Sequence, residues 1–481
     1  IYPNPTRLEL ALIFLINWIC IKMISINAIE HPFFQKFCHY LDPHFIIPKQ
    51  KALRELMIHY SDCLLEELII NMQNPYISIM IDGATRWNHH FITIILFSRY
   101  KYVYFKTTCV RSENSKNISK FLNDCIKYLI DRNKIICSIC SDDYTANIKA
   151  CKFQNLSYQI YRQYCNCHCA SLAISHQFAF KGKNYHYTQK IQLGLKLLKK
   201  LKPPFFSYIK WKSISECSSF IYDHFSEMEK IIKNMRNYMS EQYSDLLKVD
   251  WLSLKNATQI VTSFIIFTES DEMKIEMLFL KLYETVSFLK NEHTSIADDL
   301  LSEFCEVYEN NNNLLIALSA YLLTNLGSHF WLNCSEELKN YYIAKGWTGI
   351  VNYCNDSHII VTEKMHQCFI QHLCSDGIDE CNSDPYEFWI CRNNDLSDIA
   401  CRILSIPCSE TPVERLFGGL SFMLDPTSSR MKSDLVNAEM TIRMSTVFQN
   451  MHGFDGNFLL KMQKCFEYFH EYAFPEVSSI L

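Results

Sequence analysis

Glycine and proline are scarce in this sequence, with 11 and 13 residues among 481. A β fold with many tight turns uses both residues often, so their scarcity favours long helices. The formal net charge is only −4, whereas proteins that hold nucleic acid mainly by neutralising phosphates are usually basic. Any contact with nucleic acid must therefore be local, or be made by a part of the protein outside this chain. A hydrophobic content of 48% with 20% charged residues excludes a disordered protein.

The sequence also lacks a hydrophobic run that could span a membrane. The most apolar stretch, residues 10–21, is short and lies between Glu9 and Lys22, whereas a spanning helix needs about 20 apolar residues. We expect a buried helix there rather than a membrane or signal segment, and no membrane partner.

The 22 cysteines are scattered, many in apolar runs, which indicates reduced thiols rather than a disulfide framework. Because the chain begins at Ile1 and not at methionine, we expect either a fragment of a longer protein or a mispredicted start.

An apolar strand that ends in an aspartate organises the first part of the chain. Residues 76–82 are mostly Ile, Met and Tyr and end in Asp82, with Gly83 directly after it. Such a run is typical of a strand buried on both faces. The β-forming runs at 90–100 and 102–111 predict two antiparallel partners. A carboxylate at the end of a central strand points into the crevice where metal and substrate usually bind.

A second strand that leads into aspartates follows an amphipathic helix predicted over 118–131. Residues 134–141 form this strand and run into Asp142 and Asp143. A short helix over 146–152, a strand over 158–165 and a helix over 170–180 complete the pattern. The order of these elements resembles that of a ribonuclease H-like nuclease core. We therefore expect an α/β fold with a mixed five-stranded sheet.

Residues 187–380 change to a helical period with almost no strand signal, which is too long for a loop. We therefore expect a large all-helical insertion and a chain that is predominantly helical overall. The division we predict has five parts. They are a helical segment over 1–72, the first part of the core over 73–186, the insertion over 187–385, a C-terminal region over 386–450 with the last core helix, and a helical tail over 451–481.

Residues 402–417, RILSIPCSETPVERLF, resemble the C-terminal signature of hAT-family DNA transposases. The Tyr-Glu-Phe-Trp run at 386–389, the basic segment at 430–435 and residues 437–444 match further family features in the expected order. The family's FS-type continuation is replaced by Gly418 and Gly419, a departure that puts the subfamily in doubt.

Four upstream motifs also resemble the family, and together the resemblance spans about residues 30–445. They are Asp-Gly-Ala-Thr at 82–85, the Asp143 to Ala150 segment, the Cys165 to His168 segment and Ile-Lys-Trp-Lys-Ser at 209–213. The N-terminal BED zinc finger usual in the family has no counterpart before Asp82. The resemblance thus implies a transposase that lacks this finger.

The resemblance implies phosphodiester cleavage and strand transfer by two Mg²⁺ or Mn²⁺ ions held by Asp82, Asp143 and Glu414. Two hard cations can activate the attacking oxygen and stabilise the leaving one. The neighbouring Asp142 is the alternative for the second carboxylate. Asp82 could instead simply start a turn. Glu414 could instead complete a capping box that begins at Thr411, without catalysis.

Four further residues are candidates for support of the active site or the DNA end: Cys165, His168, Trp211 and Arg415. Cys165, Cys167 and Cys169 alternate as on one face of a strand, and their spacing does not suit a closed zinc site, so we expect no zinc. His168 could also be a packing residue. Trp211 could stack on an unpaired base or fill a core.

The implied partners are DNA, as transposon ends or target, and a second copy of the chain in a dimer or larger species. The implied location is the nucleus. We expect apolar helices over 399–404 and 436–448 to leave an exposed patch for a two-fold contact. Two other functions remain open. One is a catalytically inactive, domesticated protein that dimerises and binds DNA or proteins, and the other is a nuclease of the same fold without strand joining.

Overall fold

The computed structural model divides the chain into two compact units, residues 1–160 with 410–481, and residues 161–409. Each unit is described by itself. The described residues are 7–72, 74–86, 89–99, 101–110, 112, 114–152, 159–207, 212–235, 243–270, 273–311, 313–324, 335–374, 384–423 and 433–449. Trp211 and the tail predicted over 451–481 lie outside them.

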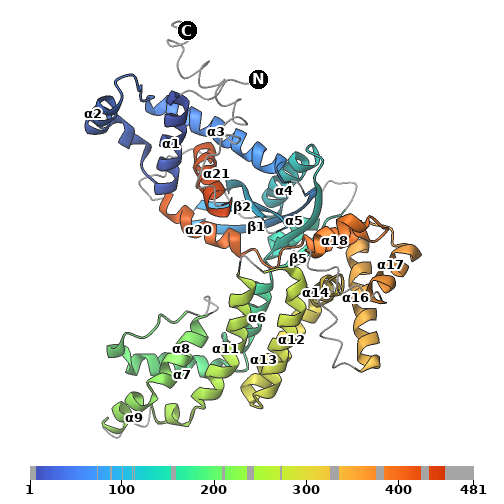
Figure 1. Cartoon of the computed structure of the whole chain (residues 1–481). Helices are drawn as coiled ribbons and strands as arrows, with labels where there is room; N and C mark the ends of the chain where they lie inside the picture. Colours follow the sequence, from blue (N-terminus) through green and yellow to red (C-terminus); the bar gives the residue numbers. More distant parts are fainter. Residues whose placement is uncertain are drawn as a thin grey trace. The chain divides into compact units, whose positions relative to one another are not determined.

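A mixed sheet with the strand order β3-β2-β1-β4-β5 forms the centre of the fold (Figure 1). Its strands are β1 (Tyr76–Arg86), β2 (His89–Ser98), β3 (Lys101–Val110), β4 (Ile135–Ser141) and β5 (Tyr161–Tyr164). β1 pairs antiparallel with β2 and parallel with β4. The predicted α/β class with a mixed five-stranded sheet is confirmed.

The helices of the first unit come from both ends of the chain. They are α1 (Arg7–Lys22), η1 (Ile26–Glu30), α2 (Pro32–Leu41), α3 (Gln50–Ile70), α4 (Ser115–Ile130), α5 (Thr145–Lys152), α20 (Thr411–Met423) and α21 (Ser433–Gln449). α21 packs against α3 and β3, and α20 packs against β1 and β2. The first unit therefore has two helices from far along the chain against its sheet.

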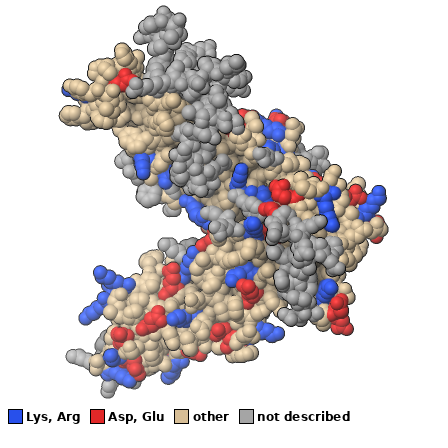
Figure 2. Space-filling view, in the orientation of Figure 1, with Lys and Arg blue, Asp and Glu red and all other residues tan. Residues whose placement is uncertain are grey.

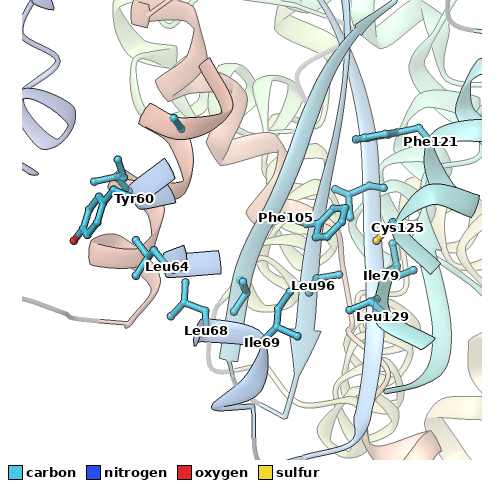
Figure 3. Close-up of a cluster of buried hydrophobic side chains, with 14 of the residues drawn as sticks. Tyr60, Leu64, Leu68, Ile69, Ile79, Leu96, Phe105, Phe121, Cys125 and Leu129 are labelled. Atoms are coloured by element: carbon cyan, nitrogen blue, oxygen red, sulfur yellow. The ribbon is translucent and has the colours of Figure 1, made fainter. Parts of the chain in front are cut away.

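The two faces of the sheet differ in chemistry because side chains alternate along a strand. Ile77, Ile79 and Ile81 of β1 share one face and belong to a continuous apolar cluster that includes residues of α3 and α4. Figure 3 shows this cluster, with side chains from α3, the sheet and α4 drawn together. On the other face the buried hydroxyl of Ser138 donates to that of Ser78 at 2.9 Å. Asp82 follows Ser78 at even spacing, so it continues this polar row.

Asn437 fixes α21 to the edge strand of the sheet. Its side-chain oxygen accepts from the Tyr104 hydroxyl and from the backbone N–H of Thr107, each at 2.7 Å. Because these groups are partly buried, leaving them without a partner would cost about 1–3 kcal/mol each. This contact holds the C-terminal helix in one register on β3.

The second unit contains the long helical region, and between residues 187 and 380 every regular element that the structure describes is a helix. Its helices are α6 (Asn166–Phe178), α7 (Tyr185–Leu197), η2 (Lys199–Leu201), α8 (Ser213–Asp223), α9 (Phe225–Lys233), η3 (Asp245–Lys248), α11 (Trp251–Thr268), α12 (Ile275–Asn291), α13 (Ser295–Asn310), α14 (Asn313–Leu322), α16 (Glu336–Asp356), α17 (Glu363–Cys374), α18 (Pro385–Arg392) and α19 (Ser397–Leu404). The predominantly helical character is confirmed.

Residues 10–21 lie in α1, and side chains such as Leu12, Ile13 and Ile16 are fully buried there. Among the described residues, no helix combines the length and the apolarity that crossing a membrane requires.

The exposed patch predicted for helices 399–404 and 436–448 is wrong. Ile399, Ile403 and Leu404 are buried, as are Val436, Met440, Ile442 and Met444. The apolar spacing correctly indicated two helices. However, α19 and α21 are covered within a single chain, because other elements pack on more than one of their sides. Substituting Glu at Met440 and Met444 would therefore disrupt a core.

Glu439 is a buried carboxyl on α21, where its charge acts on Cys20 of α1 and is influenced by Arg54 of α3. Burial raises the pKa of Glu439 from 4.5 to about 7. Since the unfolded chain keeps the ordinary pKa, this carboxyl contributes stability below pH 4.5 that is lost as the pH rises through 7.

Glu439→Gln should therefore raise the melting temperature relative to the unmutated chain at pH 8 and have less effect at pH 5. Ionisation of Glu439 lowers the free energy of unfolding by at most roughly 3 kcal/mol, at about 1.36 kcal/mol per pKa unit, and the glutamine variant avoids this loss. Thermal denaturation followed by circular dichroism at both pH values measures it. Asp434→Asn, at an exposed position of the same helix, is the matched control and should change little. An equal gain for Glu439→Gln at pH 5 and pH 8 would contradict the assignment.

Candidate active site

Two aspartates meet at one edge of the sheet because β1 and β4 run parallel. The register pairs Met80 with Cys140, so Asp82 and Asp142 each follow two residues later at the same level. One side-chain oxygen of Asp82 accepts from the backbone N–H of Gly83 at 2.6 Å. Asp142 directly follows β4, whereas β1 continues past Asp82 to Arg86, so the topology sets the two carboxyls side by side where β4 ends.

Asp142 is held in place by the turn and helix that follow it. Its Oδ1 accepts from the side-chain amide of Asn147 at 2.6 Å and from the backbone N–H of Tyr144 at 3.1 Å. Asn147 lies on α5 and is itself buried. These two hydrogen bonds fix the orientation of the Asp142 carboxylate at the end of β4.

A small pocket of ≈ 170 Å³ lies beside the two aspartates. Its walls are polar at the aspartates and apolar where β2 and α4 contribute. The lining residues are Asp82, Gly83, Ile92, Ile118, Asp142, Tyr144 and Asn147. The pocket has room for a few waters or ions rather than for a large ligand.

Two glutamates reach this edge from the far end of the chain on α20. Glu414 lies in the first turn of the helix, half-buried, and Glu410 directly precedes the helix and is fully buried. The backbone carbonyl of Glu410 accepts from the N–H of Val413 at 2.8 Å. Because α20 packs against β1 and β2, these two glutamates come close enough to act on Asp82 of β1.

Burial and nearby negative charge raise the pKa of Asp82 well above the ordinary 3.8. Burial is the largest cause, followed by the charges of Glu410, Asp142 and Glu414, while the hydrogen bond from Gly83 acts in the opposite direction. Asp82 keeps partial exposure through the pocket, but protein surrounds it on its other sides. Three carboxyl groups, from the end of β4 and the start of α20, therefore act on Asp82.

The donor set fits a hard divalent cation. All the candidate ligands are carboxylate oxygens, which Mg²⁺ and Mn²⁺ prefer, and no soft sulfur ligand lines the pocket. A cation would also offset the mutual repulsion that raises the pKa of Asp82. Asp82, Asp142 and Glu414 are the residues that would hold it, with Glu410 adding negative charge behind them.

Asp143, which the sequence favoured over Asp142, does not lie at this site. Its side chain is exposed, and it does not line the pocket. The parallel register aims Asp142 inward and turns the next residue to solvent, so the second carboxylate is reassigned to Asp142. Arg415 is exposed on α20 directly after Glu414.

Cys165 and His168 belong to the second unit, at the start of α6. Cys165 is buried at the N-cap and His168 is half-buried. The expectation that Cys165, Cys167 and Cys169 alternate on a strand is wrong, because β5 ends at Tyr164 and a helix follows. All three thiols are buried, and Cys167 Sγ lies 3.1 Å from the Thr268 hydroxyl on α11.

Glu410 is the residue that sequence reasoning missed. It lies four residues before Glu414, a spacing that places two side chains on the same side of a helix start. That spacing was visible, but a glutamate just before a helix is ordinarily a solvent-exposed cap. Only the packing of α20 on the sheet makes Glu410 a buried charge.

Residues 371–445 match the hAT family C-terminal dimerisation region. The match includes Glu410, Glu414 and Asn437, so the resemblance read from the C-terminal signature is confirmed for this part of the chain. A search among curated proteins gives no match.

Asp82→Asn should stabilise the metal-free protein at neutral and higher pH. Because the folded-state pKa of Asp82 is raised, its charged form destabilises the fold, and stability falls as the pH rises through that pKa. Thermal denaturation in the presence of a chelator at pH 5 and pH 8 measures the effect, which should be larger at pH 8. Asp143→Asn, the exposed neighbour of Asp142, should leave the melting temperature unchanged. A lower melting temperature for Asp82→Asn at pH 8 would refute the repulsive cluster.

Proposed function

We propose that the chain is an hAT-like transposase or a protein derived from one, which cleaves DNA phosphodiester bonds and joins a DNA 3′-hydroxyl to a new strand. One observation carries the proposal. The segment that matches the hAT region supplies Glu410 and Glu414, and both act electrostatically on Asp82 of β1. A lone surface carboxylate is ordinarily structural, whereas several carboxyl groups gathered around a carboxyl with a strongly raised pKa favour a cation site.

The sheet topology supports a ribonuclease H-like core as the scaffold. Three antiparallel strands precede a helix and a parallel strand, and the strand order is β3-β2-β1-β4-β5. In this arrangement Asp142 follows the carboxyl end of β4 at one edge of the sheet, and Asp82 lies level with it on the parallel strand β1. That edge is where open α/β sheets bind their ligands.

In this mechanism Asp82, Asp142 and Glu414 hold two Mg²⁺ or Mn²⁺ ions. When bound, such ions activate the attacking oxygen and stabilise the leaving oxygen of a phosphodiester. The chain's own groups position the ligands. Asn147 and the backbone N–H of Tyr144 orient Asp142, and the N–H of Gly83 orients Asp82.

DNA is the proposed substrate and partner, either as transposon ends or as target. The net charge of −4 means that DNA would be held by local contacts or by a further part of the protein. Self-association follows from the match to a dimerisation region, and the proposed location is the nucleus. The alternative function is a catalytically inactive, domesticated protein that keeps dimerisation and binding.

Cleavage of supercoiled plasmid DNA in Mg²⁺ or Mn²⁺ tests the activity. Asp82→Asn, Asp142→Asn and Glu414→Gln should each lower the rate at least about 100-fold, because loss of a group behind the ligands already costs about 10–100-fold. Asp143→Asn is the matched control and should keep the rate within a few-fold. Equal loss in Asp143→Asn and Asp142→Asn would contradict the assignment of the second carboxylate.

Calorimetric titration with Mn²⁺ separates the two candidate functions. Binding by the unmutated chain that disappears in Asp82→Asn, together with DNA cleavage, supports the transposase. Absence of both Mn²⁺ binding and cleavage, with dimerisation retained, supports the inactive alternative.

A further inference from the structure

Helix α2 has a broad apolar side. The rest of the first unit packs against one edge of that side. Gln35, Lys36 and His39 occupy one side of the helix, and the aromatic and aliphatic residues occupy the other. None of its residues is buried. A helix with this pattern ordinarily packs its apolar side against a core or a partner.

The covered edge includes an aromatic contact, besides the packing of α2 on η1. Phe34 of α2 stacks on Trp18 of α1, with ring centroids 6.1 Å apart and planes at 6°. α1 in turn is anchored to α3, where the side-chain amide of Asn17 donates to the Tyr60 hydroxyl at 3.1 Å. The position of α2 on α1 is therefore set by packing, and the rest of its apolar arc faces outward.

The outward residues of α1 and α2 form what we call the α1–α2 surface. Its side chains keep large exposed fractions: Phe14 55%, Trp18 44%, Phe33 76%, Phe37 59%, Tyr40 86% and Leu41 69%. Taking about 200 Å² for each large side chain, the exposed parts amount to roughly 750 Å². That exceeds the few hundred Å² usual for the largest apolar patch of a monomer, and it approaches the roughly 800 Å² that each partner buries in a stable interface.

Charge does not prevent this surface from meeting a copy of itself. Between Glu9 and Lys22 the sequence of α1 has no charged residue, and the one lysine of α2, Lys36, lies on its polar side. In the view of Figure 2 the surface over α2 carries few charged side chains. A two-fold contact places the same patch on both sides, so an uncharged apolar patch is self-complementary without any charge pairing.

Two observations point to a second copy rather than another partner. Residues 371–445 match a dimerisation region, yet the apolar side chains of α19 and of α21 up to Met444 are buried within one chain. α1 packs directly against α21, the last helix of the matched region. Among the described residues, the α1–α2 surface is thus an exposed apolar surface next to a helix of the matched dimerisation region.

We propose that the α1–α2 surface is the contact through which two copies of this chain associate. The proposal rests on the self-association included in the proposed function and names the surface that carries it. Phe33, Phe37, Tyr40 and Leu41 pack across a two-fold axis, and Phe14 and Trp18 of α1 border the contact.

Sedimentation velocity of the full chain over nanomolar to micromolar concentrations tests the proposal. The unmutated chain should be a dimer at micromolar concentration. Phe33→Glu with Phe37→Glu should raise the dimer dissociation constant at least about 100-fold, because buried aromatic anchors dominate interface energies. Tyr40→Lys, a milder change on the same arc, should raise it at least about 10-fold. Since these side chains are exposed in one chain, circular dichroism should remain unchanged.

Phe205→Glu is the matched control, because Phe205 is exposed to 79% in the second unit, and it should leave the dimer intact. A dimer with an unchanged dissociation constant in the double variant overturns the α1–α2 contact but leaves self-association standing. A monomeric unmutated chain overturns both. If the protein is a monomer and the double variant also melts at a lower temperature, another part of the same chain covers this surface. That result also overturns the proposal.

Discussion

The burial of Asp82 on β1 beside other carboxyl groups is the constraint around which this site is arranged. Asp82 is surrounded by protein and experiences the charges of Glu410, Asp142 and Glu414. Ionised groups in such surroundings are costly, and a fold keeps them only when other contacts hold the backbone in place. The apolar cluster beneath the sheet supplies those contacts, with Ile77, Ile79 and Ile81 on the face opposite the aspartate. The isoleucines on one face of β1 thus stabilise the fold, while the ionised aspartate on the other face destabilises it.

The return of the chain after the second unit is what completes this site. The aspartates come from strands near the beginning of the chain, and the glutamates come from α20, which packs on β1 and β2. α21 adds the hydrogen bonds of Asn437 to β3. The strands all lie between residues 76 and 164, whereas the acidic cluster also needs residues 410 and 414 of the same unit. The sheet is therefore formed by one segment of the chain, and the acidic cluster is not.

Apolar helix surfaces in this protein show how burial is decided by neighbours rather than by pattern. α19, α21 and α2 all have apolar residues at helical spacing. The first two are covered within the chain, since side chains such as Ile403 and Ile442 are inaccessible. α2 touches its unit through Phe34 and leaves Phe37 and Tyr40 outside. The same amphipathic period thus gives a core in one case and an uncovered surface in the other.

The sequence by itself determined the local elements, because strand and helix periods depend on neighbouring residues. The apolar run before Asp82, the helix before β4 and the helical region over 187–380 were predictable in this way, and so was the C-terminal signature with Glu414. Tertiary structure alone decided which of Asp142 and Asp143 faces the pocket, since one step along the chain reverses a side chain. It also decided that Glu410 is buried and that α21 is covered while α2 is not. Those outcomes depend on contacts between segments hundreds of residues apart, which no local period encodes.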